Sequence, residues 1–365
     1  MKKEILSMRE IIYIMILFIF GSSVVIGVNK SVAQDTWIAL LMAAVFMVPV
    51  ILLYARIIKL FPGKDIYDIL TELFGTFIGK IVITLITWYA LHLAGLVLRD
   101  FSDFTEITAL TETPSIAIML AMLIVSTYLA ASGIETMGKW TVLAFFVIIT
   151  IIVFTIILAL PVVDMKNFLP IMGHNFGEVA SSSYEIVSYP FAETVIFLTL
   201  AGSLKQGDSP YKTFFYGILL AALVLLFIIF RNIAVLGSKM MEDSNFPSYS
   251  AVRLINITNV LERIGGLISS NFIFTGIVKI AVCMIAAARG FAKLFNIQEY
   301  RRILIPVSLF ILAICSVSYN NTTELFVFLN VYKFYTIPFQ FIIPIVVWIF
   351  AEIRMRKKAK APQSA

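Results

Sequence analysis

Two residue types that build metal centres and disulfides are scarce in this sequence. It has two cysteines and two histidines among 365 residues. Cys283 and Cys315 lie inside apolar runs, where a thiol usually packs as a small hydrophobic group, and His92 and His174 are too few for a metal-ligand cluster. We therefore expect no disulfide, no metal site and no cofactor. The sequence also lacks a phosphate-binding loop and a nucleophile with a base at motif spacing, so we do not expect an enzyme.

Charge is also in short supply. Only 14% of the residues are charged and 60% are hydrophobic, whereas soluble domains carry about 25% charged residues. The charges cluster between apolar runs of about 20 residues, the length that crosses a bilayer. The sequence thus predicts an all-α integral membrane protein with ten transmembrane helices. Lysine and arginine concentrate in the segments that are cytoplasmic when both termini are inside, which indicates orientation and not nucleic-acid binding.

Residues 182–204 are long enough to span a bilayer but contain Glu185, Glu193 and the tripeptide Ser188-Tyr189-Pro190. Proline removes a helical hydrogen bond, and a carboxylate in hydrocarbon is unfavourable, so both are tolerated mainly where protein or trapped water satisfies them. We interpret this sixth span as a broken helix that lines a cavity. A continuous helix with a proline kink is the alternative, because proline is common in membrane helices.

The first apolar run, residues 11–28, also carries an interruption, Gly21-Ser22-Ser23. Small residues here either let the helix unwind or let another helix pack closely, and the sequence leaves both open. We expect helices 1 and 6 to be broken, since two such interruptions are what two inverted five-helix repeats would produce in ten spans. We then expect one transmembrane permease-like domain over residues 1–355, with repeats at about 8–162 and 180–353, and a basic cytoplasmic tail at 356–365.

Several polar residues fall at bilayer depth. Tyr89 and His92 are three residues apart in the third span, and Asn271, Thr275 and Lys279 recur every four residues in the eighth, so each set shares a helix face. An ionisable group within the membrane is a functional hypothesis by default. A neutral histidine bonded to a carbonyl, or a lysine that caps carbonyls, is the structural alternative. The acidic residues 100–113 predict a loop that faces outward.

The two interruptions would meet at the middle of the membrane. Amide groups at half-helix N-termini attract a carboxylate, and freed carbonyls attract an ammonium group, so together they suit a zwitterionic amino acid. The predicted ligand-binding residues are drawn from the first, third, sixth and eighth spans: Gly21, Ser22, Ser23, Tyr89, His92, Ser188, Tyr189, Pro190, Asn271 and Thr275.

The chain resembles the B subunits of the spore germinant receptors, the endospore germination permease family of the amino acid, polyamine and organocation transporter superfamily. The resemblance covers roughly residues 7–356. It rests on the span layout and on Gly21-Ser22-Ser23, FPGKDIYDIL after the second span, Glu193, Phe246-Pro247-Ser248 and Leu261-Glu262-Arg263. It implies a leucine-transporter-like fold, the inner membrane of the spore, and partnership with an A subunit and a lipoprotein C subunit.

Three functions compete. The resemblance implies a receptor subunit that senses a small germinant, an amino acid by the pocket argument, and triggers spore germination. A proton-coupled amino acid transporter is the alternative, in which Lys279 replaces a coupling cation and Glu193 is its partner. A membrane scaffold that only docks the partner subunits is the third, and the costly polar stripe at mid-membrane argues against it.

Overall fold

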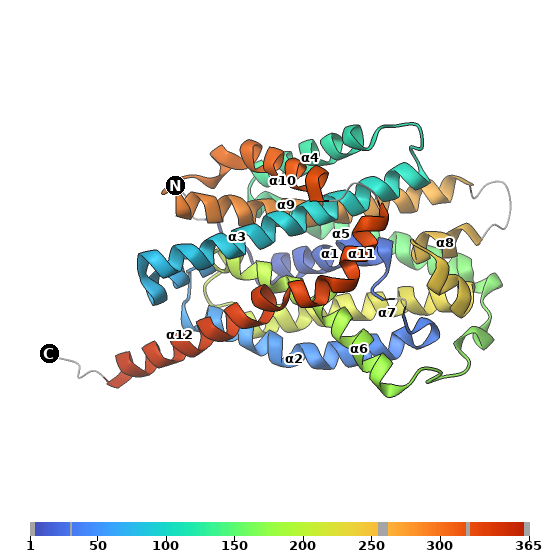
Figure 1. The fold of residues 1–365 in the computed structure, drawn as a ribbon, viewed down its shortest axis with the longest axis horizontal. Helices are drawn as coiled ribbons and strands as arrows, with labels where there is room; N and C mark the ends of the chain where they lie inside the picture. The colour runs from blue at the N-terminus through green and yellow to red at the C-terminus, as the bar shows by residue number, and fades with distance from the viewer. Residues whose placement is uncertain (1–3, 30, 255–261, 319–321, 361–365) are drawn as a thin grey trace.

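The computed structural model describes residues 4–29, 31–254, 262–318 and 322–360. It is an elongated bundle of helices that run roughly along one axis, and the chain begins and ends at the same end of the bundle (Figure 1). We call this end, which carries Glu4 and Arg354, the terminal face. The end that carries Asp35 and His174 is the opposite face.

The first half of the chain contains α1 (Met8–Ile26), a short turn η1 (Ala33–Asp35), α2 (Thr36–Leu60), α3 (Ile66–Thr108), α4 (Ser115–Ala131) and α5 (Ile134–Ala159), followed by η2 (Leu160–Val162) and η3 (Met165–Phe168). The second half contains α6 (Phe176–Ile186), η4 (Val187–Phe191), η5 (Ala192–Ser203), α7 (Pro210–Asp243), α8 (Pro247–Leu254), α9 (Glu262–Leu294), η6 (Tyr300–Ile303), α10 (Leu304–Ser318), α11 (Thr322–Tyr335), η7 (Pro338–Ile342) and α12 (Ile343–Lys360).

Within the described residues, eight helical segments are long and apolar enough to cross a membrane. α4 is apolar but has only 17 residues. The segment from α6 to η5 and the segment of α9 are the most deeply buried in the protein. The segments of α5 and α11–α12 are mostly exposed on the outside of the bundle. Apolar side chains on that outer surface suit contact with lipid. The chain is therefore a multi-pass integral membrane protein.

α1 lies in the core of the bundle. Its residues from Ile14 to Phe20 are fully buried, and the helix contacts α9, α7 and α5. A helix that is apolar all round is either buried in protein or faces lipid, and α1 is buried in protein. Its start is fixed by a capping box, in which the Ser7 hydroxyl accepts from the Glu10 amide and the Glu10 carboxylate accepts from the Ser7 amide.

The expected break at Gly21-Ser22-Ser23 is absent, because α1 continues through these residues and ends at Ile26. The helix leaves its path at Gly27, which has a φ of 86°. Close packing explains the small residues instead: a Cβ at Gly21 would lie 2.5 Å from Cδ of Lys279. The Ser23 hydroxyl is satisfied within the helix, because it donates to the Ile19 carbonyl at 2.5 Å.

The sixth span changes its path where the sequence placed Ser188-Tyr189-Pro190. α6 ends at Ile186, Tyr189 has the extended angles φ −141° and ψ 112°, and the chain continues as the tighter helix η5. Glu193 begins the first turn of η5 and is fully buried. The irregular backbone thus lies inside the protein, where neighbouring elements can satisfy its polar groups.

The prediction of an outward loop at residues 100–113 was wrong, because α3 continues to Thr108. Asp100 and Asp103 are both 2% exposed. Arg99 pairs with Asp103 at 2.8 Å, one turn along the helix, and the Thr105 hydroxyl donates to the Phe101 carbonyl. Internal ion pairing and packing therefore let a polar, acidic stretch remain helical.

The motif Phe246-Pro247-Ser248 leads into the short helix α8, on the opposite face. It packs against α7, α9 and α1, and the Tyr249 hydroxyl donates to the Thr108 carbonyl at the end of α3. Of Leu261-Glu262-Arg263, Leu261 and the side chains of the other two lie outside the described residues. The same holds for residues 361–365 of the predicted tail.

Candidate functional site

Lys279 of α9 and Glu193 of η5 form an ion pair in the centre of the bundle. The distance from Nζ to Oε2 is 2.6 Å, and both side chains are fully buried. The ammonium also faces two aromatic rings, Phe18 at 5.2 Å and Tyr189 at 5.5 Å from their centroids. Cation–π contacts add to the stabilisation of a buried cation. The core therefore holds Lys279 through one carboxylate and two rings.

The second oxygen of Glu193 accepts a hydrogen bond from the hydroxyl of Tyr332 in α11, at 2.6 Å. The Tyr332 hydroxyl lies 3.4 Å from that of Tyr89 in α3. The Gln340 amide of η7 donates both to the Tyr89 hydroxyl at 3.0 Å and to the Ser188 carbonyl at 2.8 Å. This chain of contacts joins Lys279 to the irregular backbone of η4.

Tyr54 of α2 completes the network on the side of the terminal face. Its hydroxyl donates to the Gln340 carbonyl at 2.6 Å and lies 3.4 Å from the Ala192 carbonyl. Both carbonyls belong to irregular helical segments, so a side chain supplies the partner that a regular helix would have supplied. Five segments, α2, α3, η4–η5, α9 and α11–η7, thus meet through polar side chains at this level.

A cavity of about 410 Å³ lies between this network and the opposite face. Tyr189 and Tyr332 line it together with residues from the ends of α1 and α6, from the loops after α1 and α7, and from α11: Ile26, Gly27, Val28, Asn29, Ser31, Glu185, Asn245, Thr323, Phe326, Val327, Leu329, Asn330 and Lys333. The Tyr332 hydroxyl is bonded to Glu193. The same aromatic side chain therefore borders the cavity and touches the buried ion pair.

A second ion pair lines this cavity. Lys333 of α11 contacts Glu185 of α6 at 2.5 Å, and the Asn29 amide donates to the other oxygen of Glu185. Tyr184 donates to the Lys333 carbonyl at 3.2 Å. These contacts connect the end of α1, the helix α6 and the helix α11. A change in their relative positions would have to break them.

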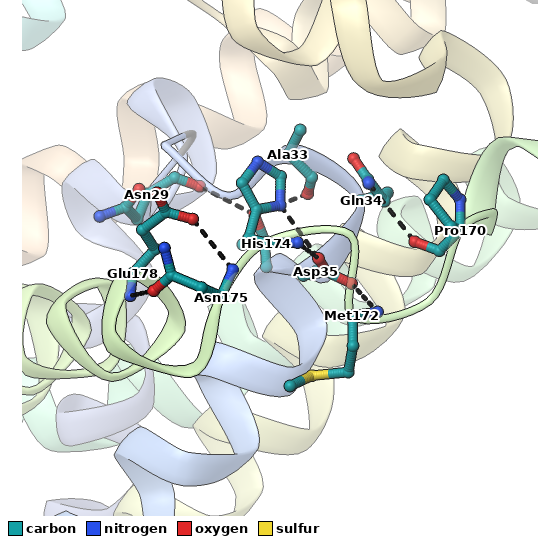
Figure 2. A network of polar contacts seen from close by, with 10 residues as sticks. Asn29, Ala33, Gln34, Asp35, Pro170, Met172, His174, Asn175 and Glu178 are labelled. Carbon is teal, nitrogen blue, oxygen red and sulfur yellow. Dashed lines mark hydrogen bonds and ion pairs between the residues drawn. The ribbon is translucent and has the colours of Figure 1, made fainter.

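Asp35 anchors the loops of the opposite face (Figure 2). Its fully buried carboxylate accepts from the Met172 amide at 2.8 Å and from the His174 amide at 3.1 Å, and it lies 3.0 Å from Nδ1 of His174. Gln34 donates to the Pro170 carbonyl at 3.4 Å. The segment that leads into α2 is therefore tied to the segment that leads into α6.

The terminal face is closed by the residues that precede α1. Glu4 pairs with Arg289 at 3.3 Å and with Arg301, and it accepts from the Tyr300 hydroxyl at 3.0 Å. Leu6 exchanges backbone hydrogen bonds of 2.7 and 2.8 Å with residues 203 and 205. This N-terminal strap, residues 4–7, links the start of α1 to the ends of η5 and α9, beside a pocket of about 650 Å³.

The structure brings some of the predicted site residues together and separates others. Gly21, Tyr89, Ser188 and Tyr189 lie at the network around Lys279 and Glu193. Pro190 is buried beside them in η4. Among the nine predicted ligand residues whose side chains the structure describes, Tyr189 is the one that lines the 410 Å³ cavity.

The remaining predicted residues have other contacts. His92 belongs to an aromatic cluster with Trp88, Phe328 and Tyr335. The Thr275 hydroxyl donates to the Phe272 carbonyl of its own helix. Ser22 is buried in α1. Asn271 lies in α9, and its side chain is outside the described residues.

Tyr332, Gln340 and Tyr54 are site residues that the sequence analysis missed. A weak signal existed for one of them, because Gln340 is a polar residue inside an apolar run and follows Pro338 closely. Tyr54 and Tyr332 gave no signal, because tyrosine is common in membrane helices.

Several known proteins are similar to this chain in amino-acid sequence. Residues 5–325 match the family described as spore germination protein. Spore germination protein KB of Bacillus subtilis (strain 168) is 25% identical over 366 residues, which cover 99% of this chain and 98% of the relative. The putative spore germination protein YfkT of the same organism is 23% identical and covers 91% of each chain.

Solved transporters share the fold. Mhp1, a nucleobase-cation-symport-1 family transporter in a closed conformation with bromovinylhydantoin bound, has a TM-score of 0.64 at 13% identity, over 93% of this chain and 77% of its own. MhsT in complex with L-phenylalanine has a TM-score of 0.64 at 11% identity, over 96% and 99%. The likeness shows a membrane-transporter fold, and the family match, which spans most of the chain, shows that the protein belongs to the spore germination protein family.

Proposed function

We propose that this protein is the membrane subunit of a spore nutrient germinant receptor, which binds a small germinant and triggers germination. The germinant is an amino acid in this proposal. Its relatives are named as germination proteins, and MhsT, which shares its fold, was solved with L-phenylalanine. The protein is a permease-like binding subunit rather than an enzyme.

The proposed architecture has ten transmembrane helices in two inverted five-helix repeats, a leucine-transporter-like arrangement. α1 and α4 join the eight segments that are long and apolar enough to span a membrane. Both termini are then cytoplasmic, in the inner membrane of the spore, which makes the terminal face the cytoplasmic one. The basic residues near the end of α12 support this orientation. An A subunit and a lipoprotein C subunit are the proposed partners.

The observation that carries the proposal is the 410 Å³ cavity, whose lining residue Tyr332 also bonds Glu193. Its volume lies within the range of small-molecule pockets. A ligand that repositions Tyr189 or Tyr332 would disturb the Lys279–Glu193 pair directly. A ligand shifts a conformational equilibrium only through its different affinity for the two states. Because Tyr189 and Tyr332 contact both the cavity and the pair, a ligand in the cavity would bind with different affinity to the states in which the pair is formed and broken.

Proton-coupled amino acid transport is the second candidate, favoured by the fully buried Lys279–Glu193 pair itself. Buried ion pairs are weak contributors to stability, because desolvation opposes their attraction. A fully buried pair suits a protein in which a proton or a charged ligand replaces one partner of the pair during transport. Uptake of the ligand across the membrane would distinguish this function from sensing.

The test is germination of spores that lack the gene, with and without a restored copy, across amino acids, sugars and salts. Radiolabelled uptake of each active compound is followed in parallel. We expect loss of the response to one amino acid without uptake in the restored strain. A restored copy with Lys279→Met should insert in the membrane and give no response. A normal response from that variant contradicts the role of Lys279, and Lys279-dependent accumulation of the nutrient favours transport.

A further inference from the structure

Three buried polar groups from three different elements lie near one another, beside the Lys279–Glu193 pair. The Ser22 hydroxyl of α1, both carboxylate oxygens of Asp100 of α3 and the Tyr189 hydroxyl of η4 have no hydrogen-bond partner among the described residues. Ser22 is close enough to interact with both Asp100 and Tyr189. Buried polar groups are nearly always bonded in native proteins. An unpaired acidic oxygen with two hydroxyls around it therefore indicates a site for a further group.

The charges of this region do not balance. Lys279 is bonded to Glu193 at 2.6 Å, and Arg99 is bonded to Asp103 at 2.8 Å. Asp100 has no ion-pair partner within the described residues, so the cluster is one positive charge short when every group is ionised. A single uncompensated charge in the protein interior is strongly unfavourable. A bound cation next to Asp100 would balance the charge of the ionised cluster.

Tyr189 separates this position from the 410 Å³ cavity. Its ring lines the cavity, its hydroxyl faces Ser22, and its backbone leaves the helical conformation at this residue. A side chain on irregular backbone can rotate without breaking a helical turn. Tyr189 is therefore the side chain that links the cavity to the surroundings of Ser22 and Asp100.

We propose that Asp100 is the anchor for the ammonium group of an amine-bearing ligand, with the hydroxyls of Ser22 and Tyr189 as additional acceptors. The proposal rests on the proposed ligand-binding function and narrows it. The ligand class is a primary amine, such as an α-amino acid, and a hydroxyl analogue of the same shape is excluded. Side-chain recognition of the amine replaces recognition by free helix carbonyls, since α1 is continuous through Ser22.

The test uses the purified full-length protein in lipid nanodiscs. L-alanine, L-valine, L-leucine and L-phenylalanine are compared with the 2-hydroxy acids of the same shape and with glucose, by the concentration dependence of the unfolding temperature. We expect at least one amino acid to stabilise the wild type and its hydroxy acid to have no effect. Asp100→Asn should weaken amino acid binding by about tenfold or more, as expected for loss of a charged hydrogen bond.

Asp103→Asn is the matched control, because it makes the same change three residues along α3 in a carboxylate that Arg99 already neutralises. It should keep amino acid binding within about threefold of wild type. If Asp100→Asn does not fold, Ser22→Ala takes its place and should weaken the binding of amino acids by about threefold or more. Equal binding by the wild type and by whichever of the two variants folds overturns the proposal.

Two results separate this proposal from the function on which it rests. If hydroxy acids bind the wild type as tightly as amino acids, or if only glucose binds, the protein still binds a small molecule but the ammonium anchor is refuted. If no compound changes the unfolding temperature, ligand binding itself fails and the anchor with it.

Discussion

Gly21 and Lys279 fit together without space for a further methyl group. A Cβ at position 21 would lie 2.5 Å from Cδ and 3.0 Å from Cβ of the lysine, well inside contact distance. Lys279 reaches Glu193 across the face of α1 that glycine leaves open. The absence of a side chain on one helix thus determines where the charge of another helix lies.

Gly21→Ala should displace Lys279 and separate it from Glu193. Overpacking in a well-packed core costs about 1–3 kcal/mol, and the unfolding temperature in nanodiscs measures it. Gly177→Ala is the control, because the nearest atom to its Cβ is Oδ1 of Asn175, at 3.2 Å on the exposed start of α6. An unchanged unfolding temperature for Gly21→Ala would contradict the packing argument.

The Lys279–Glu193 pair should show strong coupling between its two members. Lys279→Met leaves a buried carboxylate without its cation, and breaking a buried pair in this way costs about 3–5 kcal/mol. The double variant Lys279→Met with Glu193→Gln removes both charges and should recover much of that stability. A double-mutant cycle of unfolding free energies measures the coupling. Additive effects of the two single substitutions on the free energy of unfolding would mean that the two charges do not interact.

Tyr332→Phe should weaken the network without removing a charge. It deletes the hydroxyl that donates to Glu193 at 2.6 Å, and a hydrogen bond to a charged group contributes about 1.5–3 kcal/mol. Tyr89→Phe should have a smaller effect on Glu193, because Tyr89 reaches it only through Tyr332, at 3.4 Å between the hydroxyls. The free energy of unfolding of each variant measures the effect. Equal losses of stability in Tyr332→Phe and Tyr89→Phe would show that the direct hydrogen bond from Tyr332 to Glu193 is not the stronger contribution.

Asp65 should make stability depend on pH. It is the N-cap of α3, outside the spans, and its burial, with the nearby charge of Asp68, raises its pKa from 3.8 to about 6. Between these two values the folded state binds more protons than the unfolded state, so the free energy of unfolding falls as the pH rises from about 4 to 6. Above pH 6 this contribution is constant.

Asp65→Asn keeps an effective N-cap and removes the titration. The variant should therefore lack the part of the decline that Asp65 causes and be more stable than the wild type at pH 7. Chemical unfolding in nanodiscs at several pH values between 4 and 7 measures both effects. Parallel curves for the two proteins would assign the decline to another group.

The N-terminal strap should control access to the core from the terminal face. Cys283 is fully buried one turn along α9 from Lys279, toward Arg289. Glu4→Ala removes the acceptor shared by Arg289, Arg301 and Tyr300. Thiol labelling of Cys283 should then become at least several-fold faster, as expected when opening of a closed state governs reactivity. Cys315→Ala serves as the common background, and an unchanged rate would mean that the strap does not limit access.

The sequence predicted features that depend on single, unusual residues. A mid-membrane lysine, a carboxylate near a proline and a Ser-Tyr-Pro tripeptide are each rare enough to be noticed, and Lys279, Glu193 and Tyr189 lie together in the structure. The family resemblance, which rested in part on Glu193, is confirmed. These signals are local and do not require knowledge of how helices pack.

The features that escaped prediction depend on packing between distant segments. Tyr332 reaches Glu193 across 139 residues of chain, and only the rotation of α11 decides whether its hydroxyl faces the core or lipid. Gly21-Ser22-Ser23 was compatible with both unwinding and close packing until the position of Lys279 was known. Asp100 belongs to a polar stretch whose local composition resembles a loop, and tertiary contacts override such a preference.

The N-terminal strap also sets the order in which the protein can be assembled. Glu4 is translated before its partners Arg289, Tyr300 and Arg301, which follow almost three hundred residues later. The contacts of the strap with α9 and η6 therefore cannot form until the eight helices α1–α8 and then α9 and η6 have been synthesised. Until that point the Glu4 carboxylate has neither of the two arginines with which it pairs in the folded protein.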